Sequence, residues 1–208
     1  MIAIIDYDAG NLASVARAVS HLGYANVVTR NVAEIRSADR IIFPGVGAAG
    51  SAMTSLKRLG MDAALHEAFL QGKPMLGICL GTQIIMGFSE ENQTPCLGII
   101  PGVVEAFSPD ICDSDGKRLK IPQMGWNRIH IVRNHPVLNG LKEADEFYFV
   151  HGFYPVPAHS DHIVGTTRYG IQFASVVGYR NILATQFHLE KSGRPGLAML
   201  NNFCQWMP

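Results

Sequence analysis

Short apolar runs alternate with helix-like segments over the first half of the chain. Three such runs come before residue 45, at residues 2–6, 26–30 and 40–43. They are typical of parallel strands that are buried on both faces. After the first run, apolar residues recur at helical spacing from Leu12 to Leu22, which predicts a helix with Asn11 as its N-cap and Gly23 as its stop. Strands that alternate with helices predict a parallel sheet with right-handed crossovers.

The same alternation continues up to a cysteine. Two helical segments are predicted at about residues 49–59 and 61–71, and Gly72 is a stop signal after the second. The next apolar run ends at Cys79, and another helix is predicted to begin near Gly81. Cys79 is therefore expected at a turn from a strand into a helix.

The second half of the chain has a different pattern of apolar and polar residues. Between about residues 98 and 187 it consists of short β-like runs separated by turn residues, which predicts antiparallel hairpins. The runs are VVEAF (103–107), KRLKI (117–121), NRIHIV (127–132), EFYFVHGFY (146–154), HIVGTTRY (162–169), FASVVGYR (173–180) and NILATQF (181–187). A last helix is predicted at about residues 195–206. With no linker or internal repeat, residues 1–208 are expected to form a single α/β domain, with a mixed, mainly parallel central sheet and antiparallel additions in the second half.

Composition narrows the classes of function. The 17 basic and 17 acidic residues balance, and the basic residues are scattered, which argues against nucleic acid and anionic membranes as partners. No apolar run approaches the roughly 20 residues of a membrane span, and the first residues lack the pattern of a signal peptide. The four cysteines show no C-x-x-C spacing, so neither a zinc site nor a disulfide framework is indicated. We expect a cytoplasmic protein whose partners are small molecules or another protein.

Cys79 has the surroundings of a nucleophile. Gly77 and Gly81 stand two residues before and two after it, as in the elbow that exposes a nucleophile at the edge of a sheet. The alternative is that Cys79 is a small apolar residue of a buried strand, as many free cysteines are.

A base for such a nucleophile is available near the end of the chain. Residues two apart in an extended segment point to the same side, so His188 and Glu190 can face one pocket. An imidazole can take the thiol proton, and a carboxylate behind it selects the tautomer and stabilises the imidazolium. The alternative is a surface His-x-Glu that arises by chance.

A glycine-rich turn precedes the predicted helix at residue 49. Residues 45–50 match the pattern G-x-G-x-x-G, but they follow the third predicted strand, whereas the dinucleotide fingerprint belongs to the first. We favour a different use of the glycines, in which backbone N–H groups of this turn and the amide after Cys79 approach a developing oxyanion.

Three motifs carry a resemblance to a known family. They are PGVG (44–47), GICLGTQ (77–83) and QFHLEKS (186–192), and they resemble the triad-type glutamine amidotransferases. Three further motifs are similar to those of the glutaminase subunits of imidazole glycerol phosphate synthases: DYDAGNL (6–12), PQMGWN (122–127) and YFVH (148–151). The resemblance covers essentially the whole chain and implies a flavodoxin-like α/β sandwich.

The resemblance also implies a reaction. Cys79 would attack the side-chain amide of glutamine, His188 would move protons, and Glu190 would orient His188. A glutamyl thioester and ammonia would result, with no metal or cofactor. The oxyanion would be bound by the glycine turn, which is Gly45, Val46 and Gly47, and by the amide of Leu80.

Other residues are assigned to substrate and partner by the same resemblance. Gln83, His151 and Gly152 would help to hold glutamine. The residues expected to face the partner, a β/α-barrel cyclase subunit in a heterodimer, are Asn11, Trp126 and Lys191. Ammonia would pass into that barrel and be used there to make imidazole glycerol phosphate and aminoimidazole carboxamide ribotide, in histidine biosynthesis.

Three residues depart from the usual family pattern. Thr82 stands in place of methionine, Leu189 in place of proline and Gly152 in place of serine or threonine. The alternatives are therefore a related glutaminase that feeds ammonia to a barrel synthase of surface-sugar synthesis, an interaction protein with an idle triad, and a cysteine hydrolase of peptides or esters.

Overall fold

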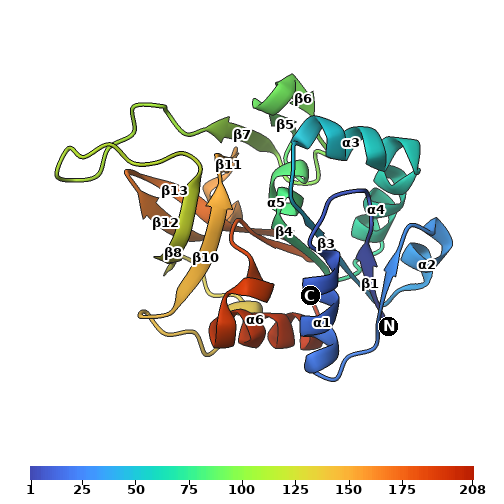
Figure 1. Ribbon diagram of the computed structural model, residues 1–208. Coiled ribbons are helices and arrows are strands. Elements are labelled where there is room, and N and C mark those ends of the chain that lie inside the picture. The colour runs from blue at the N-terminus through green and yellow to red at the C-terminus, as the bar shows by residue number, and fades with distance from the viewer.

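A computed structural model describes residues 1–208 (Figure 1). Its centre is an eight-stranded sheet in the order β2-β1-β3-β4-β14-β13-β12-β9. The first five strands in this order pair in parallel, and the last three are antiparallel. The strands are β1 (Ile2–Ile5), β2 (Asn26–Thr29), β3 (Arg40–Gly45), β4 (Met75–Cys79), β9 (His130–Ile131), β12 (Ile163–Tyr169), β13 (Ile171–Tyr179) and β14 (Ile182–Thr185).

Helices cover both faces of this sheet. They are α1 (Leu12–His21), α2 (Val32–Ser37), α3 (Ala49–Arg58), α4 (Met61–Leu70), α5 (Leu80–Ile84) and α6 (Gly193–Gln205). Alternate residues of β1 enter different cores: Ile5 packs in the core with α2, α3 and α4, and Ile4 packs in the core with α1 and α6. The predicted α/β sandwich is confirmed, because strands that are apolar at every position need a helical layer on each side.

Two small sheets extend the second half. One pairs β8 (Gln123–Arg128) with β10 (Glu146–His151), and the other has the order β11-β7-β5-β6. The strands of the latter are β5 (Phe88–Ser89), β6 (Thr94–Pro95), β7 (Gly102–Ala106) and β11 (Phe153–Pro157). Single 3₁₀ turns occur at η1 (Glu91–Gln93), η2 (Pro136–Leu138), η3 (Ser160–His162) and η4 (Leu189–Lys191). β10 and β11 follow each other directly, so His151 and Gly152 lie where the two small sheets meet.

One local prediction is wrong, and a second is confirmed only in position. Residues 117–121 form no strand, because only Arg118 makes an isolated bridge, to Cys112. Asn11 stands at the predicted N-cap position of α1, but its backbone is left-handed, with φ of +74°, and its side chain makes no capping bond to the helix. The prediction for Gly23 is confirmed, since it follows the helix with φ of +86°. None of the helices has both the length and the apolar character that a bilayer crossing requires.

Candidate active site

Cys79 lies at a sharp turn between β4 and α5. Its φ of +55° and ψ of −104° are unusual for a residue with a side chain. A Cβ on Gly81 would lie 2.0 Å from the carbonyl oxygen of Phe43, and one on Gly77 would lie 2.9 Å from the Cβ of Ala184. Both glycines are therefore required by close backbone approach, as an elbow demands. The sulfur lies 3.9 Å from the carbonyl oxygen of Val150.

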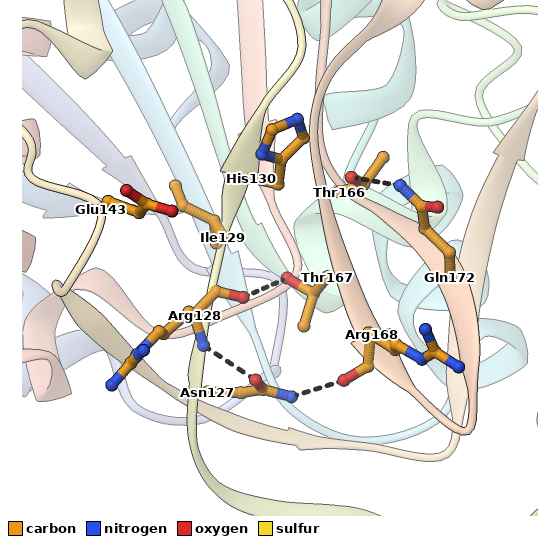
Figure 2. A pocket seen from close by; sticks show the side chains of 9 residues that line it. All are labelled: Asn127, Arg128, Ile129, His130, Glu143, Thr166, Thr167, Arg168 and Gln172. Carbon is orange, nitrogen blue, oxygen red and sulfur yellow. Dashed lines mark hydrogen bonds between the residues drawn. The ribbon is translucent and has the colours of Figure 1, made fainter. Parts of the chain in front are cut away.

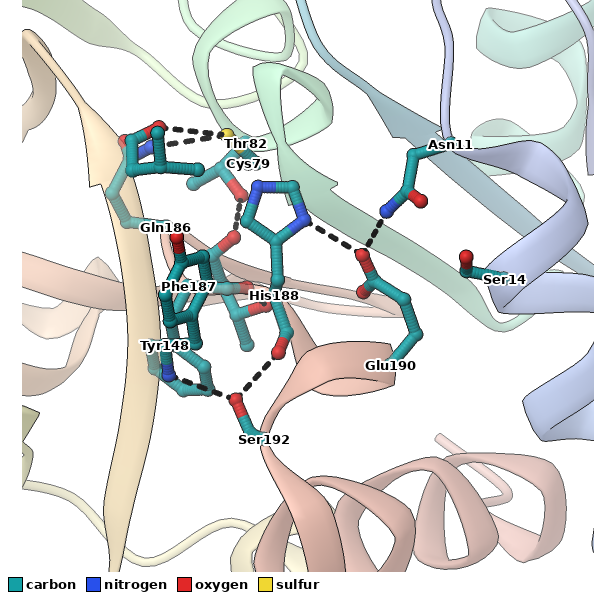
Figure 3. A network of polar contacts seen from close by, with 12 residues as sticks. Asn11, Ser14, Cys79, Thr82, Tyr148, Gln186, Phe187, His188, Glu190 and Ser192 are labelled. Carbon is teal, nitrogen blue, oxygen red and sulfur yellow. Dashed lines mark hydrogen bonds and ion pairs between the residues drawn. The ribbon is translucent and has the colours of Figure 1, made fainter. Parts of the chain in front are cut away.

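His188 and Glu190 meet through a hydrogen bond. Nδ1 of His188 lies 2.7 Å from Oε1 of Glu190, and the two side chains are 2% and 0% exposed. The expected extended segment is wrong: the 3₁₀ turn η4 begins directly after His188 and brings the carboxylate behind the ring. Figure 3 shows the other ring nitrogen, Nε2, on the side of Cys79. The structure thus brings the three expected residues together.

The charge state of His188 depends on both neighbours. Burial lowers the pKa of His188, but attraction to Cys79 and the bond to Glu190 outweigh burial and raise this pKa to about 9. Nε2 is buried and makes no hydrogen bond of good geometry, so the influence of Cys79 is one of proximity and charge. The arrangement favours an imidazolium beside the sulfur.

The backbone of His188 is attached to β10. Its N–H donates to the carbonyl of Tyr148 at 2.9 Å. The hydroxyl of Ser192 donates to the carbonyl of His188 and accepts the N–H of Tyr148 at 3.0 Å (Figure 3). His188 is thus held by long-range contacts.

Asn11 reaches the same carboxylate from α1. Its side-chain amide donates to Oε1 of Glu190, the oxygen that also accepts from His188. The other oxygen, Oε2, is buried without a partner. The side chain of Asn11 therefore serves Glu190 in place of the helix cap that was predicted.

A pocket of about 270 Å³ opens beside Cys79, and we call it the Cys79 pocket. The residues predicted for oxyanion and substrate are gathered there: Val46, Gly47, Leu80, Gln83, His151 and Gly152 line it. Gly45 does not line the pocket, but it pairs with Cys79 in the register of β3 and β4. The sheet edge therefore brings the glycine turn and the elbow side by side, while the roles of these residues remain predictions.

Gln83 is fixed by two hydrogen bonds. Its amide nitrogen donates to the carbonyl of Phe153 at 3.1 Å and to the side-chain oxygen of Gln186 at 3.2 Å. Gln186 in turn directs its amide nitrogen at the sulfur of Cys79, at 3.8 Å. The Gln83 oxygen makes no hydrogen bond within the protein. This oxygen can accept one from a ligand.

His151 has a neutral ring. Nδ1 lies 2.7 Å from the carbonyl oxygen of Phe153, and Nε2 lies 3.0 Å from the side-chain oxygen of Gln123. Burial lowers the pKa of His151 to about 4. A neutral ring carries one N–H, which can be donated to one of these two oxygen neighbours. His151 organises the pocket wall and is no proton donor to it.

Glu91 was missed by sequence reasoning. It lies in η1, within a polar loop whose residues form no motif, and it is one of the residues that line the Cys79 pocket. Oε2 accepts the N–H of Ala49 at 2.7 Å, at the first residue of α3. A carboxylate held in this way can accept a hydrogen bond from a cationic ligand group.

Comparisons with known proteins show the family of this chain. A sequence model of the family described as "Glutamine amidotransferase class-I" matches residues 3–206. The chain is 48% identical to the imidazole glycerol phosphate synthase subunit HisH of Nitratidesulfovibrio vulgaris (strain DP4), over 98% of this chain and 95% of that protein. It is also 48% identical to the HisH subunit of Desulfovibrio desulfuricans, with coverage of 99% and 94%. The chain belongs to the class I glutamine amidotransferase family, among its HisH subunits.

Solved structures show the amidotransferase fold at low sequence identity. A crystal structure titled as a glutamine amidotransferase aligns with a TM-score of 0.71 at 17% identity, covering 98% of this chain and all of that one. The PurLQS structure from Thermotoga maritima also aligns with a TM-score of 0.71 at 17% identity, covering 100% and 98%. The predicted fold class is confirmed by these neighbours.

The outer face of the β8–β10 sheet of this amidotransferase is partly apolar. Met124 and Trp126 are 66% and 55% exposed, and the Trp126 ring lies 6.0 Å from that of Tyr148, edge to face. The ammonium of Lys191 lies 5.7 Å from the Tyr148 ring centre, within the range of a cation–π contact. Two residues predicted to face a partner, Trp126 and Lys191, thus flank the same tyrosine.

A separate polar pocket of about 340 Å³ lies between β8 and β12 (Figure 2). It shares no residue with the Cys79 pocket, and some of its lining residues form hydrogen bonds with one another. The Asn127 amide donates to the Arg168 carbonyl at 3.0 Å, and Gln172 donates to Thr166 at 2.8 Å. No cysteine or serine lines this pocket. The structure also contains no group of three or more His, Cys, Asp or Glu residues that could hold a metal ion.

Proposed function

We propose that this chain is the glutaminase subunit of an imidazole glycerol phosphate synthase. It hydrolyses glutamine to glutamate and ammonia through a thioester on Cys79. One observation carries the proposal: Cys79 lines a pocket of about 270 Å³, and His188, bonded to Glu190 at 2.7 Å, lies beside its sulfur. The HisH relatives support the choice of reaction and of pathway.

The first half of the reaction forms the thioester. The Cys79 sulfur attacks the side-chain carbonyl carbon of glutamine, and its proton is held by His188 as an imidazolium. His188 gives that proton to the amide nitrogen as the carbon–nitrogen bond breaks, and ammonia leaves. The raised pKa of His188 suits this step, because the ring carries the proton until the leaving group takes it.

Water completes the reaction. His188, now neutral, accepts a proton from a water molecule that attacks the thioester carbonyl, and the sulfur leaves with glutamate released. Glu190 holds the ring in one tautomer throughout and stabilises the imidazolium. Asn11 keeps the carboxylate in place.

The negative charge of both tetrahedral intermediates falls on the former carbonyl oxygen. The amide of Leu80 and the glycine turn, Gly45, Val46 and Gly47, are the proposed donors, and the N-terminus of α5 follows directly. A preorganised amide of this kind is worth about 3 kcal/mol in other hydrolases.

The other end of glutamine needs complementary groups. Glu91 is suited to the α-ammonium group, because it lines the pocket and one of its carboxylate oxygens is already fixed by Ala49. Gln83 offers its free side-chain oxygen. Gly152 contributes only backbone atoms to the pocket lining. A Cβ at this position would meet only Ile121, at 3.7 Å.

The partner is a β/α-barrel cyclase subunit, and the pair is a cytoplasmic heterodimer. The exposed face that carries Trp126 and Lys191 would contact the barrel, and Asn11 would lie at its border. Ammonia would enter the barrel without meeting solvent. There it would be used to form imidazole glycerol phosphate and aminoimidazole carboxamide ribotide, in histidine biosynthesis.

Glutamate release from the reconstituted pair tests the proposal. The purified chain is mixed with the cyclase subunit, and glutamate is measured with and without the cyclase substrate. We expect negligible hydrolysis by the chain alone, a strong rise in the complex, and none with Cys79→Ala. Full activity without the partner would contradict the coupling.

Covalent labelling separates this function from an idle triad. A glutamine-derived electrophile should modify Cys79, seen as one mass increment that is absent from Cys79→Ala. An interaction protein with an inert site would not be labelled. A peptide or ester hydrolase would instead cleave peptides or esters. In a glutaminase, Glu91→Ala should raise KM for glutamine, and a peptide or ester hydrolase would not show this effect.

A further inference from the structure

Tyr7 follows β1 and is buried directly behind the glycine turn. Its side chain is 1% exposed, and its hydroxyl makes no hydrogen bond. Tyr7 lines a second cavity, of about 200 Å³, which shares Val46, Gly47 and Leu80 with the Cys79 pocket. The glycine turn is therefore a thin wall, with the Cys79 pocket on one side and this cavity on the other.

The Tyr7 hydroxyl touches the backbone of Gly45. A Cβ placed on Gly45 would lie 2.2 Å from the Tyr7 oxygen, closer than any real contact. Gly45 is also the residue that pairs with Cys79 between β3 and β4. The hydroxyl thus supports the turn at the point where the turn meets the elbow.

Packing alone does not account for this hydroxyl. A buried hydroxyl without a partner destabilises the fold, and phenylalanine would fill the same space without that cost. Burial, and after it the charge of Cys79, raise the pKa of Tyr7, so the hydroxyl keeps its proton and remains a hydrogen-bond donor. Because it is enclosed, the acceptors that can come within its reach are backbone carbonyls of the adjoining turns and groups in the cavity.

We propose that Tyr7 is a positioning residue for glutamine hydrolysis: from behind Gly45, its hydroxyl holds the glycine turn so that the turn's amides face the developing oxyanion. This inference rests on the proposed function. Tyr7 touches neither the substrate nor the sulfur in this role, because it acts through the backbone of Gly45, Val46 and Gly47.

Tyr7→Phe in the reconstituted complex tests the role. We expect kcat for glutamate release to fall about tenfold, while KM for glutamine stays within about twofold. The melting temperature should not fall, since the variant loses no hydrogen bond. The matched control is Tyr24→Phe, which removes a hydroxyl bonded to Asn201 at 3.0 Å and should lower the melting temperature without changing kcat.

A second pair of variants tests the contact itself. Gly45→Ala should lower the melting temperature, and Tyr7→Phe in the same chain should restore part of the loss. The closest neighbours would then be the Cβ of Ala9 and the ring carbon of residue 7, at 3.1 Å each. No recovery in the double variant would contradict the contact and the inference with it.

The outcomes separate this inference from the proposed function. An active wild-type complex with an equally active Tyr7→Phe overturns the role of Tyr7 and leaves the glutaminase in place. A raised KM with unchanged kcat also overturns it, because the turn would then act in binding only. A wild-type complex that releases no glutamate overturns the proposed function and this inference together.

Discussion

The two sides of the candidate active site are built by different means. Cys79 is positioned locally, by a strand, a helix and two glycines that allow the backbone to approach Phe43 and Ala184. His188 and Glu190 are positioned by hydrogen bonds from distant elements, among them Asn11 of the α1 N-terminus and Tyr148 of β10. Steric placement leaves little tolerance, whereas a set of hydrogen bonds can be weakened in steps. A substitution on the Cys79 side should therefore abolish activity, whereas substitutions on the His188 and Glu190 side should reduce activity in steps.

The largest effect is expected on the nucleophile side. Gly81→Ala places a Cβ 2.0 Å from the Phe43 carbonyl oxygen, so β4 or α5 must shift. We expect the free energy of unfolding to fall by about 4 kcal/mol or more, with activity abolished. Urea unfolding measures this. Gly152→Ala is the control for stability, since its Cβ would meet nothing closer than 3.7 Å; similar losses in both variants would argue against the steric account.

The second effect concerns the carboxylate behind the imidazole. Glu190→Gln keeps the shape but removes the charge that His188 binds at 2.7 Å. We expect kcat for glutamate release to fall about 10²- to 10⁴-fold, because the imidazolium is less stable and the tautomer is less restricted. The pKa of His188, followed by NMR, should fall as well. An unchanged titration would contradict the electrostatic role of Glu190.

A smaller effect is expected from the residue that holds this carboxylate. Asn11→Ala removes the amide that donates to Glu190 but leaves His188 bonded to it. We expect an approximately tenfold loss in kcat, in line with one hydrogen bond to a charged group. Asn11→Asp places a like charge beside Glu190 and should lose more. Affinity for the cyclase subunit, measured in parallel, shows whether Asn11 also acts at the interface.

The smallest effect concerns coupling between the two sides. The folded-state pKa of His188, about 9, is above the roughly 6.5 of an unfolded chain. The ring therefore stabilises the fold fully below about pH 6.5, and this contribution is lost as the pH rises through about 9. In Cys79→Ala the pKa of His188 should be lower, because the attraction of the sulfur is gone. The free energy of unfolding, measured with urea, changes between about pH 6 and pH 9.5. This change should differ by about 1 kcal/mol between the wild-type chain and Cys79→Ala. Identical curves would mean that the two sides are electrostatically independent.

The same difference between local and long-range placement explains which sequence predictions are confirmed. The first half could be predicted closely, because apolar runs and helical spacing are local signals and β1, β3 and β4 are buried on both faces. The segment at 117–121 could not, since its alternation of basic and apolar residues is not accompanied by a partner strand. Strand formation depends on pairing, which a short pattern does not contain.

The sequence by itself determined the fold class, the elbow at Cys79 and the identity of His188 and Glu190 as its candidate partners, because each of these depends on residue types at fixed spacing. Only the tertiary structure decided how the partners meet. A 3₁₀ turn, which the spacing did not predict, brings Glu190 behind His188, and Asn11 donates its amide to that carboxylate instead of capping a helix. Glu91 belongs to no motif, and the motif at residues 6–12 assigned no role to Tyr7. Their roles rest on contacts with Ala49 and Gly45, which lie far away in the chain. Such contacts exist only after the sheet has assembled, because the carboxyl ends of its parallel strands are what bring these segments together.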